Sequence, residues 1–304
     1  MQRIIKAICK AVGTVEKMSK YVFSLYIFKK NKTFNIHNSF ETIEYIISNH
    51  ASVSRFGDGE FKIMMGEGIG FQDADIPLAK RLNEILNSSG KNFKHIVCIP
   101  YPLESLHGLK KRSRNFWLKF ISDNYRPLLK MIPLHVIFYD ANFTRFYMDF
   151  QEINNCRKKI DEIKRIWNKR EVVIVEGTGT RMGVNNDLFN NVKSLRRIIC
   201  PSRNAFNVYN HIFTYICNNI EKEALVLCAL GMTATVLAFD LYNVGYQAID
   251  IGHIDIEYEW FLMNAKEKSP VVGKSVNECG INNPDEVDSV IYREQIIYTI
   301  DINT

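Results

Sequence analysis

Ser54-Arg55-Phe56-Gly57-Asp58-Gly59-Glu60 is the stretch around which the rest of the chain is organised. The β-branched and aromatic content of residues 53–56 predicts a strand, and the glycines that follow predict the turn where this strand ends. Gly57 and Gly59 leave room for a ligand to approach the backbone. Asp58 and Glu60 are hard oxygen donors that suit Mg²⁺ or Mn²⁺ on a diphosphate, and Arg55 could reach a phosphate or steady the carboxylates. A bare Asp-x-Glu is nevertheless more often a solvated acidic turn.

Apolar strands and amphipathic helices alternate along the remainder of the chain. We predict strands at residues 95–100, 134–139, 171–175, 196–200, 224–230 and 246–251. We predict helices at residues 40–50, 61–65, 75–86, 114–131, 151–168, 205–218 and 231–242, and a helix or strand at 293–300. Ser39 is the expected cap of the first helix, and Pro127 is expected to kink or break the fourth.

This alternation decides the fold class. Near-continuous apolar strands between helices indicate an α/β fold with a mostly parallel sheet covered by helices on both faces. No linker rich in Gly, Ser or Pro divides the chain. We therefore expect one domain over residues 36–304, preceded by an N-terminal extension over residues 1–35.

Composition excludes several classes of protein. The chain has 304 residues, of which 46% are apolar and 24% charged, as in ordinary soluble proteins. Its seven cysteines are widely spread without a Cys-x-x-Cys pair, which favours buried free thiols in a reducing cytosol over disulfides or structural zinc. Residues 1–33 hold eight Lys and Arg and one Glu, a charge of +7, so the remainder of the +6 chain carries −1. A neutral body gives no support for a nucleic-acid groove.

The N-terminal extension is a basic amphipathic segment. Lysines alternate with apolar residues up to position 20, and an apolar and aromatic run follows at residues 21–28. This run is too short to span a bilayer, and no signal-peptide cleavage site is evident. The segment can lie in an anionic lipid interface, or it can be a helix packed on the body or on a partner; both interpretations stay open.

A glycine-rich loop is predicted after the strand at residues 171–175. Its sequence, Gly177-Thr178-Gly179-Thr180-Arg181-Met182-Gly183, misses both the dinucleotide fingerprint and the P-loop. We interpret it as a loop whose amides, threonine hydroxyls and Arg181 hold phosphate or ribose. Asn186 and Asp187 either order this loop or bind polar groups of the ligand.

Two further strand ends carry groups suited to anions. Gly231, Met232 and Thr233 place amides at the start of a helix, which suits a diphosphate, although Met232 is equally suited to packing. Arg145 and Arg203 are additional cations, and Asn204 could read the edge of a ribose or nucleobase. Ligands of open α/β sheets bind beyond the carboxyl ends of the strands, where all these groups are expected.

The second acidic cluster is Gly252-His253-Ile254-Asp255-Ile256-Glu257-Tyr258-Glu259-Trp260. If a strand continues here, His253, Asp255 and Glu257 share one side. A helix would instead bring Asp255 and Glu259 together.

Taken together, the blocks resemble a known family. Arg-Phe-Gly-Asp-Gly-Glu, the loops at 177–189, 204–206 and 230–235, and the segment 252–260 resemble, in the same order, the bacterial GT-D-type glycosyltransferases, once known only as a domain of unknown function (DUF1792). The similarity runs from about residue 40 to near residue 300. It implies a Rossmann-like catalytic domain that uses a metal ion and a UDP-sugar to extend a glycan. It also favours His253, as a metal or phosphate ligand, and Glu259 as functional residues.

The resulting prediction is a cytoplasmic glycosyltransferase, active at the inner face of the bacterial plasma membrane if the extension binds lipid. It would move a hexose from a UDP-sugar to a glycan of a cell-surface polysaccharide or glycoprotein. Asp58 and Glu60 would hold Mn²⁺ or Mg²⁺, and Glu259 or Asp255 would act as base. The expected donor-binding residues are Arg55, Gly57, Gly177, Thr178, Gly179, Arg181, Asn186, Asp187, Arg203, Asn204, Gly231, Met232 and Thr233. The alternatives are a nucleotidyl- or phosphotransferase on a similar fold, or a non-catalytic membrane-peripheral partner that binds nucleotide sugars.

Overall fold

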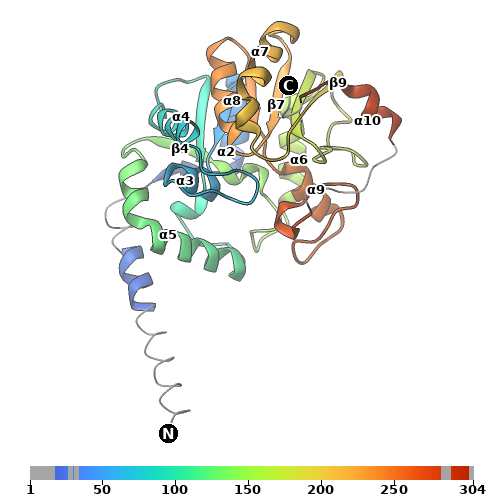
Figure 1. The fold of residues 1–304 in the computed structure, drawn as a ribbon. Helices are drawn as coiled ribbons and strands as arrows, with labels where there is room; N and C mark the ends of the chain where they lie inside the picture. The colour runs from blue at the N-terminus through green and yellow to red at the C-terminus, as the bar shows by residue number, and fades with distance from the viewer. Residues whose placement is uncertain (1–17, 27–29, 31–33, 282–288, 301–304) are drawn as a thin grey trace, which may run out of the picture.

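The protein is built on a nine-stranded parallel sheet. The computed structural model describes residues 18–26, 30, 34–281 and 289–300 (Figure 1). The strand order is β1-β4-β3-β2-β8-β7-β5-β6-β9, and every neighbouring pair is parallel. The strands are β1 (Asn35–His37), β2 (Ser52–Arg55), β3 (His95–Ile99), β4 (Ile137–Asp140), β5 (Glu171–Gly177), β6 (Ser194–Cys200), β7 (Leu225–Ala229), β8 (Gln247–Asp250) and β9 (Ile296–Thr299). The predicted α/β fold with a mostly parallel sheet is confirmed.

The strand order creates a switch point beside β2. From β2 the chain moves outward through β3 and β4, and it then crosses to β5 and β6 before returning through β7 to β8. Strand β8 pairs with β2, Val53 lying opposite Ile249. Ligands of such sheets bind at the carboxyl edge where the strand order reverses.

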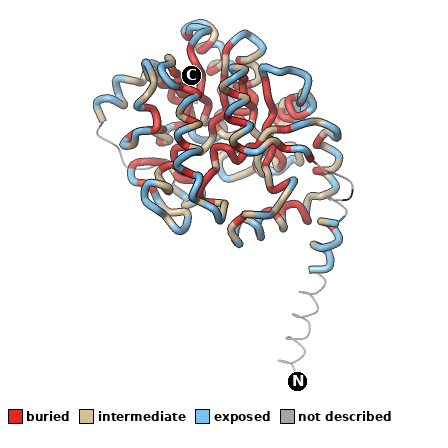
Figure 2. Tube along the Cα trace, turned by 180° about the vertical axis from the view of Figure 1, so that it is seen from behind, coloured by how far each residue is buried: buried red, intermediate tan, exposed pale blue. Residues whose placement is uncertain are grey.

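Alternating strand residues feed two separate cores. Val172 and Ile174 face one core, whereas Val173 and Val175 face another on the opposite side of the sheet. Helices α2 (Ser39–Asn49), α6 (Cys156–Lys164) and α9 (Ile254–Leu262) cover the first face. Helices α3 (Asp58–Met64), α4 (Ile76–Asn87), α5 (Lys111–Met131), α7 (Tyr209–Asn219) and α8 (Met232–Asn243) cover the second. The buried residues therefore run through the middle of the molecule between exposed helix faces (Figure 2).

Three local predictions need correction. The cap of α2 is Asn38 rather than Ser39, because the Asn38 side chain accepts from the amides of Phe40 and Glu41 while Glu41 bonds back to the Asn38 amide. Helix α5 runs through Pro127, so of the expected kink or break the break does not occur. The acidic stretch does not stay in a turn, since α3 already begins at Asp58.

The C-terminal region closes the sheet edge. Helix α10 (Val290–Gln295) leads into β9, which pairs with β6. The six described cysteines are free, and Cys98, Cys156, Cys200 and Cys228 are buried, as predicted; Cys9 lies outside the described residues.

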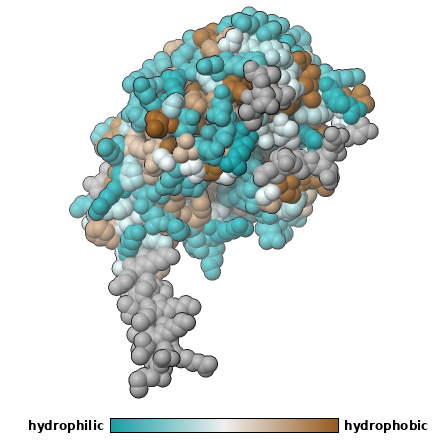
Figure 3. Space-filling view, viewed as in Figure 1, coloured by the Kyte–Doolittle hydropathy of each residue, from teal (hydrophilic) through white to brown (hydrophobic). Residues whose placement is uncertain are grey.

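The predicted helix of the N-terminal extension lies mostly outside the described residues. Residues 18–26 form a helix, from which Leu25 packs on the core and Lys20 pairs with Asp123 of α5 at 3.4 Å. Within the described part of the chain, no helix has the length and apolar character needed to cross a membrane. The face in Figure 3 is mainly hydrophilic, with apolar side chains scattered across it.

Candidate active site

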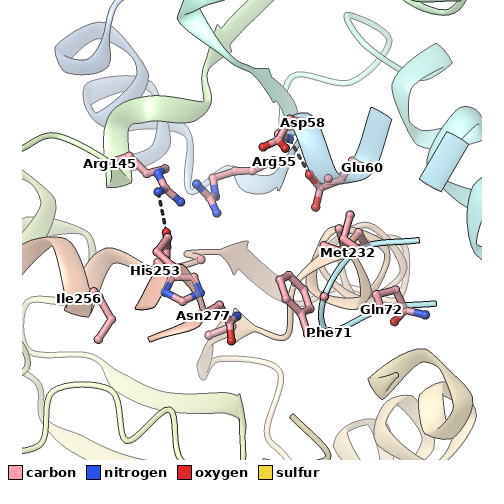
Figure 4. Close-up of a pocket in the computed structure, with 18 of the residues that line it drawn as sticks. Arg55, Asp58, Glu60, Phe71, Gln72, Arg145, Met232, His253, Ile256 and Asn277 are labelled. Carbon is pink, nitrogen blue, oxygen red and sulfur yellow. Dashed lines mark hydrogen bonds and ion pairs between the residues drawn. The ribbon is translucent and has the colours of Figure 1, made fainter. Parts of the chain in front are cut away.

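A cavity of about 660 Å³ opens at the carboxyl edge of the sheet. The ends of β2, β5, β6, β7 and β8 contribute to its wall, as do helices α3, α5 and α9. Of the sequence-predicted residues, Arg55, Gly57, Asp58, Glu60, Arg145, Gly177, Arg203, Gly231, Met232, His253 and Asp255 line it. Figure 4 labels Arg55, Asp58, Glu60, Arg145, Met232 and His253 among them. Most of the predicted strand ends therefore do meet at one site.

The acidic pair lies in the first turn of α3. The Glu60 carboxylate accepts a hydrogen bond from the Gly57 amide at 2.6 Å, so Glu60 stabilises the start of the helix. Asp58 forms an ion pair with Lys62, one turn further along, at 2.8 Å. Both carboxylates thus have a local partner and still line the cavity.

Glu60 is a carboxyl group in an unusual environment. Only 8% of the residue is exposed. Burial and the nearby carboxylate of Asp250 raise the pKa of Glu60 to about 7, against the opposing effects of the Gly57 amide and Arg55. Asp250, the last residue of β8, was not identified from the sequence because it ends an ordinary apolar strand. It lines the cavity beside Arg55.

Arg55 joins the ends of three strands. Its Nε donates to the Asp250 carbonyl at 3.0 Å, and its Nη1 donates to the Ala141 carbonyl at 3.1 Å and to Thr144 Oγ1 at 2.7 Å. Ala141 directly follows β4, so the guanidinium holds β2, β4 and β8 in register at the cavity floor. Arg55 therefore steadies the acidic residues at the switch point as well as presenting a cation to the cavity.

The glycine-rich loop after β5 reaches the cavity only in part. Gly177 and Thr180 line the cavity, whereas the Thr178 hydroxyl donates to the Cys200 carbonyl at 3.1 Å. The Gly179 carbonyl accepts from Ser275 at 2.8 Å. Arg181, which lies outside the cavity lining, donates from Nη1 to the Gly273 carbonyl at 2.7 Å. Its guanidinium therefore fastens the C-terminal segment to this loop.

Asn186 and Asp187, for which two roles were considered, both bond to other parts of the chain in this structure. The Asn186 amide donates to Asp255 at 2.7 Å and to Glu259 at 2.6 Å. Asp187 accepts from Lys164 at 3.0 Å and from the Tyr258 hydroxyl. Neither Asn186 nor Asp187 lines the cavity.

The second acidic cluster forms a helix, α9, which brings Asp255 and Glu259 together. Lys274 lies between them, with its Nζ at 2.7 Å from Asp255 and 2.8 Å from Glu259. Asp255 and Lys274 are both buried, and Asp255 also accepts from the Gly183 amide at 2.9 Å. Asp255 lines the cavity, whereas Glu259 lies behind it. Lys274 was not predicted as part of the site, because a single lysine in a loop cannot be distinguished by sequence from a solvent-exposed lysine.

The turn into α8 is closely packed. A Cβ on Gly231, which has φ +55°, would lie 2.5 Å from the ring of Phe71. Met232 packs on α3 so closely that a Cβ on Gly59 would lie 2.4 Å from its terminal methyl group. Both glycines are needed for close approach, and Met232 has the packing role that was one of its two predicted roles. Thr233 is buried outside the cavity lining, and its hydroxyl has no hydrogen-bond partner in the described structure.

Arg203 and Asn204 hold the loop that carries Phe71. Arg203 pairs with Asp73 at 2.9 Å, and the Asn204 amide donates to the same carboxylate at 2.7 Å. The backbone N–H of Asn204 also donates a hydrogen bond, to the Phe71 carbonyl oxygen at 2.9 Å. Arg203 lines the cavity and Asn204 does not, so Asn204 acts here as an anchor for the 71–73 loop.

A charged cluster from three segments lines the opposite side. Arg145 contacts Glu278 at 2.8 Å, Asp149 at 3.6 Å and the buried Glu257 at 4.0 Å. His253 lies in the same region, and burial lowers its pKa against the opposing effect of the Glu278 carboxylate. Glu278 and Asp149 were not predicted as site residues, because they lie in segments without a recognisable motif.

The predicted metal ligands do not by themselves form a complete coordination site for a metal ion. In the described ranges, no group of three His, Cys, Asp or Glu side chains could hold a metal ion. In Figure 4 the Arg55 side chain lies between His253 and the acidic pair of Asp58 and Glu60. Mg²⁺ is commonly held by one or two carboxylates, with substrate phosphates and water completing its shell. Asp58 and Glu60 offer the carboxylate oxygens that a cation of that kind needs.

Comparison with known proteins gives consistent matches. A family model described as "Glycosyltransferase GT-D fold" matches residues 53–279. The chain is 35% identical over 264 residues to Glycosyltransferase GlyD of Streptococcus pneumoniae serotype 4, and 34% identical over 259 residues to Probable glycosyl transferase Gly of Streptococcus gordonii. The alignments cover 86% and 84% of this chain but 32% and 37% of the relatives. The chain therefore spans about a third of the length of these curated relatives.

Solved structures agree with the sequence matches. A structure described as domain of unknown function 1792 with a distinct glycosyltransferase fold superimposes with a TM-score of 0.88 at 35% identity, covering 91% of this chain and 100% of that one. Another, described as a new glycosyltransferase (DUF1792) from Streptococcus sanguinis, gives a TM-score of 0.85 at 32% identity, with coverage of 88% and 100%.

Proposed function

The chain belongs to the GT-D glycosyltransferase family, and on that premise we propose that it transfers a hexosyl group from a UDP-sugar to a hydroxyl of a glycan acceptor, assisted by Mn²⁺ or Mg²⁺. The observation that supports this proposal is the meeting of Asp58, Glu60, Arg55 and the glycine turns at 177 and 231 around one cavity. The family membership read from the sequence blocks is confirmed by the family model. The donor, the acceptor and the metal are part of the proposal.

The reaction requires stabilisation of a departing nucleoside diphosphate. The bond between the anomeric carbon and the diphosphate oxygen breaks, the acceptor oxygen bonds to that carbon, and the acceptor proton passes to a base. Negative charge develops on the diphosphate as it leaves. A bound cation, held through Asp58 and Glu60, would neutralise part of this charge. Arg55 and the amides at Gly231 and Met232 offer further positive groups in the same cavity.

Asp255 and Glu259 remain the proposed base. Asp255 lines the cavity and Glu259 is joined to it through Lys274 and Asn186. Of the two, only Asp255 lines the cavity. If Asp255 accepts the acceptor proton, Asp255→Asn should lower kcat for transfer while the melting temperature stays near that of the wild type. A melting temperature that falls in step with the activity would instead show that the carboxylate acts only through the Lys274 contacts.

The metal role is tested with two conservative variants. Asp58→Asn and Glu60→Gln should each lower Mn²⁺-dependent release of UDP from a panel of UDP-hexoses by about 100-fold or more. Glutamine at position 60 can still bond to the Gly57 amide, so the start of α3 is preserved. Asp161→Asn, on the exposed face of α6, is the matched control and should keep full activity. Near-normal turnover in Asp58→Asn or Glu60→Gln would refute the metal role.

We further propose that the N-terminal segment brings the protein to an anionic membrane surface. Met18, Val22 and Tyr26 recur at helical spacing and are 56%, 64% and 59% exposed, next to the exposed Phe23. Basic residues surround them in the sequence, which suits an anionic interface. Val22→Glu/Phe23→Glu should reduce sedimentation with phosphatidylserine vesicles, whereas Phe93→Glu, at an exposed site elsewhere, should not. Equal sedimentation of the two variants would leave packing on the body as the role of this helix.

A further inference from the structure

One wall of the cavity is formed by helix α5, which is separate from the glycine turns proposed to bind the nucleotide. Helix α5 contributes Arg112, Ser113, Phe116 and Trp117 to the lining. It belongs to the connection between β3 and β4, whereas the glycine turns belong to β5 and β7. The sheet order puts β3 and β4 on one side of the β2–β8 pair and β7, β5 and β6 on the other. The cavity therefore extends from the glycine turns, across Asp58 and Glu60, to an aromatic wall on α5.

Phe116 is the apolar centre of this wall. It is 45% exposed, although it lines a cavity and is surrounded by polar residues. Its ring meets Trp117 edge-on, with centroids 5.5 Å apart and an interplanar angle of 85°, and lies nearly parallel to Phe120 at 6.3 Å. Trp117 and Phe120 are buried in the core, so Phe116 is supported from behind. The exposed part of a supported aromatic ring is a rigid apolar platform.

Hydrogen-bonding groups surround the platform. Ser113 Oγ donates to Asp149 at 2.6 Å, and Asp149 in turn lies 3.6 Å from Arg145. Arg112 is exposed and lines the same wall. Lys62 Nζ lies 6.0 Å from the centroid of the Phe116 ring and connects the wall to Asp58. Small-molecule sites commonly combine an apolar surface with a few placed polar groups of this kind.

A pyranose ring matches both features, because it has an apolar C–H face and a rim of hydroxyls that donate and accept hydrogen bonds. We propose that Phe116 forms the acceptor subsite, where the terminal sugar of the acceptor glycan packs its C–H face on the ring. Arg112, Ser113 and Asp149 then hydrogen-bond to the hydroxyls. The inference rests on the proposed function, since a sugar held there lies across the acidic pair from the nucleotide-binding turns.

The test measures binding of a sugar separately from chemistry on the donor. Saturation-transfer NMR on the full chain, with UDP and Mn²⁺ present, uses methyl β-glucopyranoside and methyl N-acetyl-β-glucosaminide as probes. The wild type should saturate the ring C–H protons of at least one probe. Phe116→Ala should weaken that binding about tenfold, and Phe116→Trp should restore it. Phe93→Ala removes a phenylalanine that is 67% exposed outside the cavity lining and serves as the matched control.

Hydrolysis of the UDP-hexose without an acceptor provides the second readout. Phe116→Ala should change the KM for the donor by a smaller factor than it weakens binding of the glycoside, because Phe116 is connected to the acidic pair only through Lys62. Absence of probe binding by the wild type, or equal binding by wild type and Phe116→Ala, overturns the subsite. A chain that never releases UDP, yet binds the glycosides through Phe116, instead overturns the proposed transferase reaction and keeps the sugar site.

Discussion

The guanidinium of Arg55 lies directly against Gly252: a Cβ built on this glycine would be 1.8 Å from Nη2. Gly252 has φ +51° and follows β8 at the point where the chain turns toward His253. Only a residue without a side chain leaves room for the arginine, which bonds to the Asp250 carbonyl and to Thr144. The close approach of these two residues sets the floor of the cavity.

Replacing Gly252 should therefore lower the free energy of unfolding by more than backbone strain alone would. Gly252→Ala forces Arg55 out of its bonds, whereas Gly108→Ala, at φ +76° with no atom within 4 Å of the new Cβ, introduces only strain. We expect Gly108→Ala to lower the free energy of unfolding by about 1 kcal/mol and Gly252→Ala by about 1–3 kcal/mol more. Urea unfolding of the two variants measures the difference, and equal losses would contradict the packing argument.

Lys274 should be essential for stability although it lies in a loop. Lys274→Met removes the partner of two carboxylates, of which Asp255 is buried, and so leaves charge without compensation. The expected loss is about 3–5 kcal/mol in the free energy of unfolding. Lys266→Met, at an exposed position eight residues earlier in the same segment, should change it by less than about 0.5 kcal/mol. Similar unfolding curves for both variants would show that the network contributes little.

Removing one member of the buried ion pair between Arg197 and Glu176 should lower the free energy of unfolding more than replacing both members. The two side chains meet at 2.7 Å, and each also bonds to the backbone of Met182, which lines the cavity. Arg197→Met should cost about 3–5 kcal/mol because Glu176 stays buried and unpaired. The double variant Arg197→Met/Glu176→Gln should recover part of that loss, since no buried charge remains. A double variant less stable than Arg197→Met would reject this account.

His95 should make stability depend on pH. The imidazole is buried between the rings of Phe239 and Tyr242, and burial lowers its pKa from 6.5 to about 3. Between these values the unfolded chain binds a proton that the folded chain does not, so stability falls as the pH drops below 6.5. This residue contributes a slope of about 1.4 kcal/mol per pH unit.

The matching variant is His95→Gln, which keeps a donor for Ser54 Oγ, 3.0 Å from His95 Nε2. Free energies of unfolding measured at pH 6.5 and pH 5 should differ by less in the variant than in the wild type. An unchanged difference would mean that His95 is protonated in the folded state.

Local patterns were enough to predict the sheet and the position of the site. Apolar runs at 171–175 and 224–230 indicated buried parallel strands, and these strands are β5 and β7 at the centre of the sheet. Parallel strands present their carboxyl ends at one edge, so the turns after them were expected to meet, and the cavity contains them. The beginning of α3 was missed because the capping contact from Glu60 to Gly57 also fits a turn motif.

The individual roles at the site could not be predicted, because they depend on partners that are distant in sequence. Arg181 and Asn186 looked like ligand-binding groups, yet their bonds go to Gly273, Asp255 and Glu259. Phe116 looked like any apolar residue of an amphipathic helix until α5 was placed beside the cavity. The sequence by itself determined the order of strands along the chain and the chemistry available at their ends, since both follow from local periodicity and residue type. Tertiary structure alone decided which polar groups satisfy one another and which remain facing the cavity, because hydrogen bonds and burial depend on distances in space.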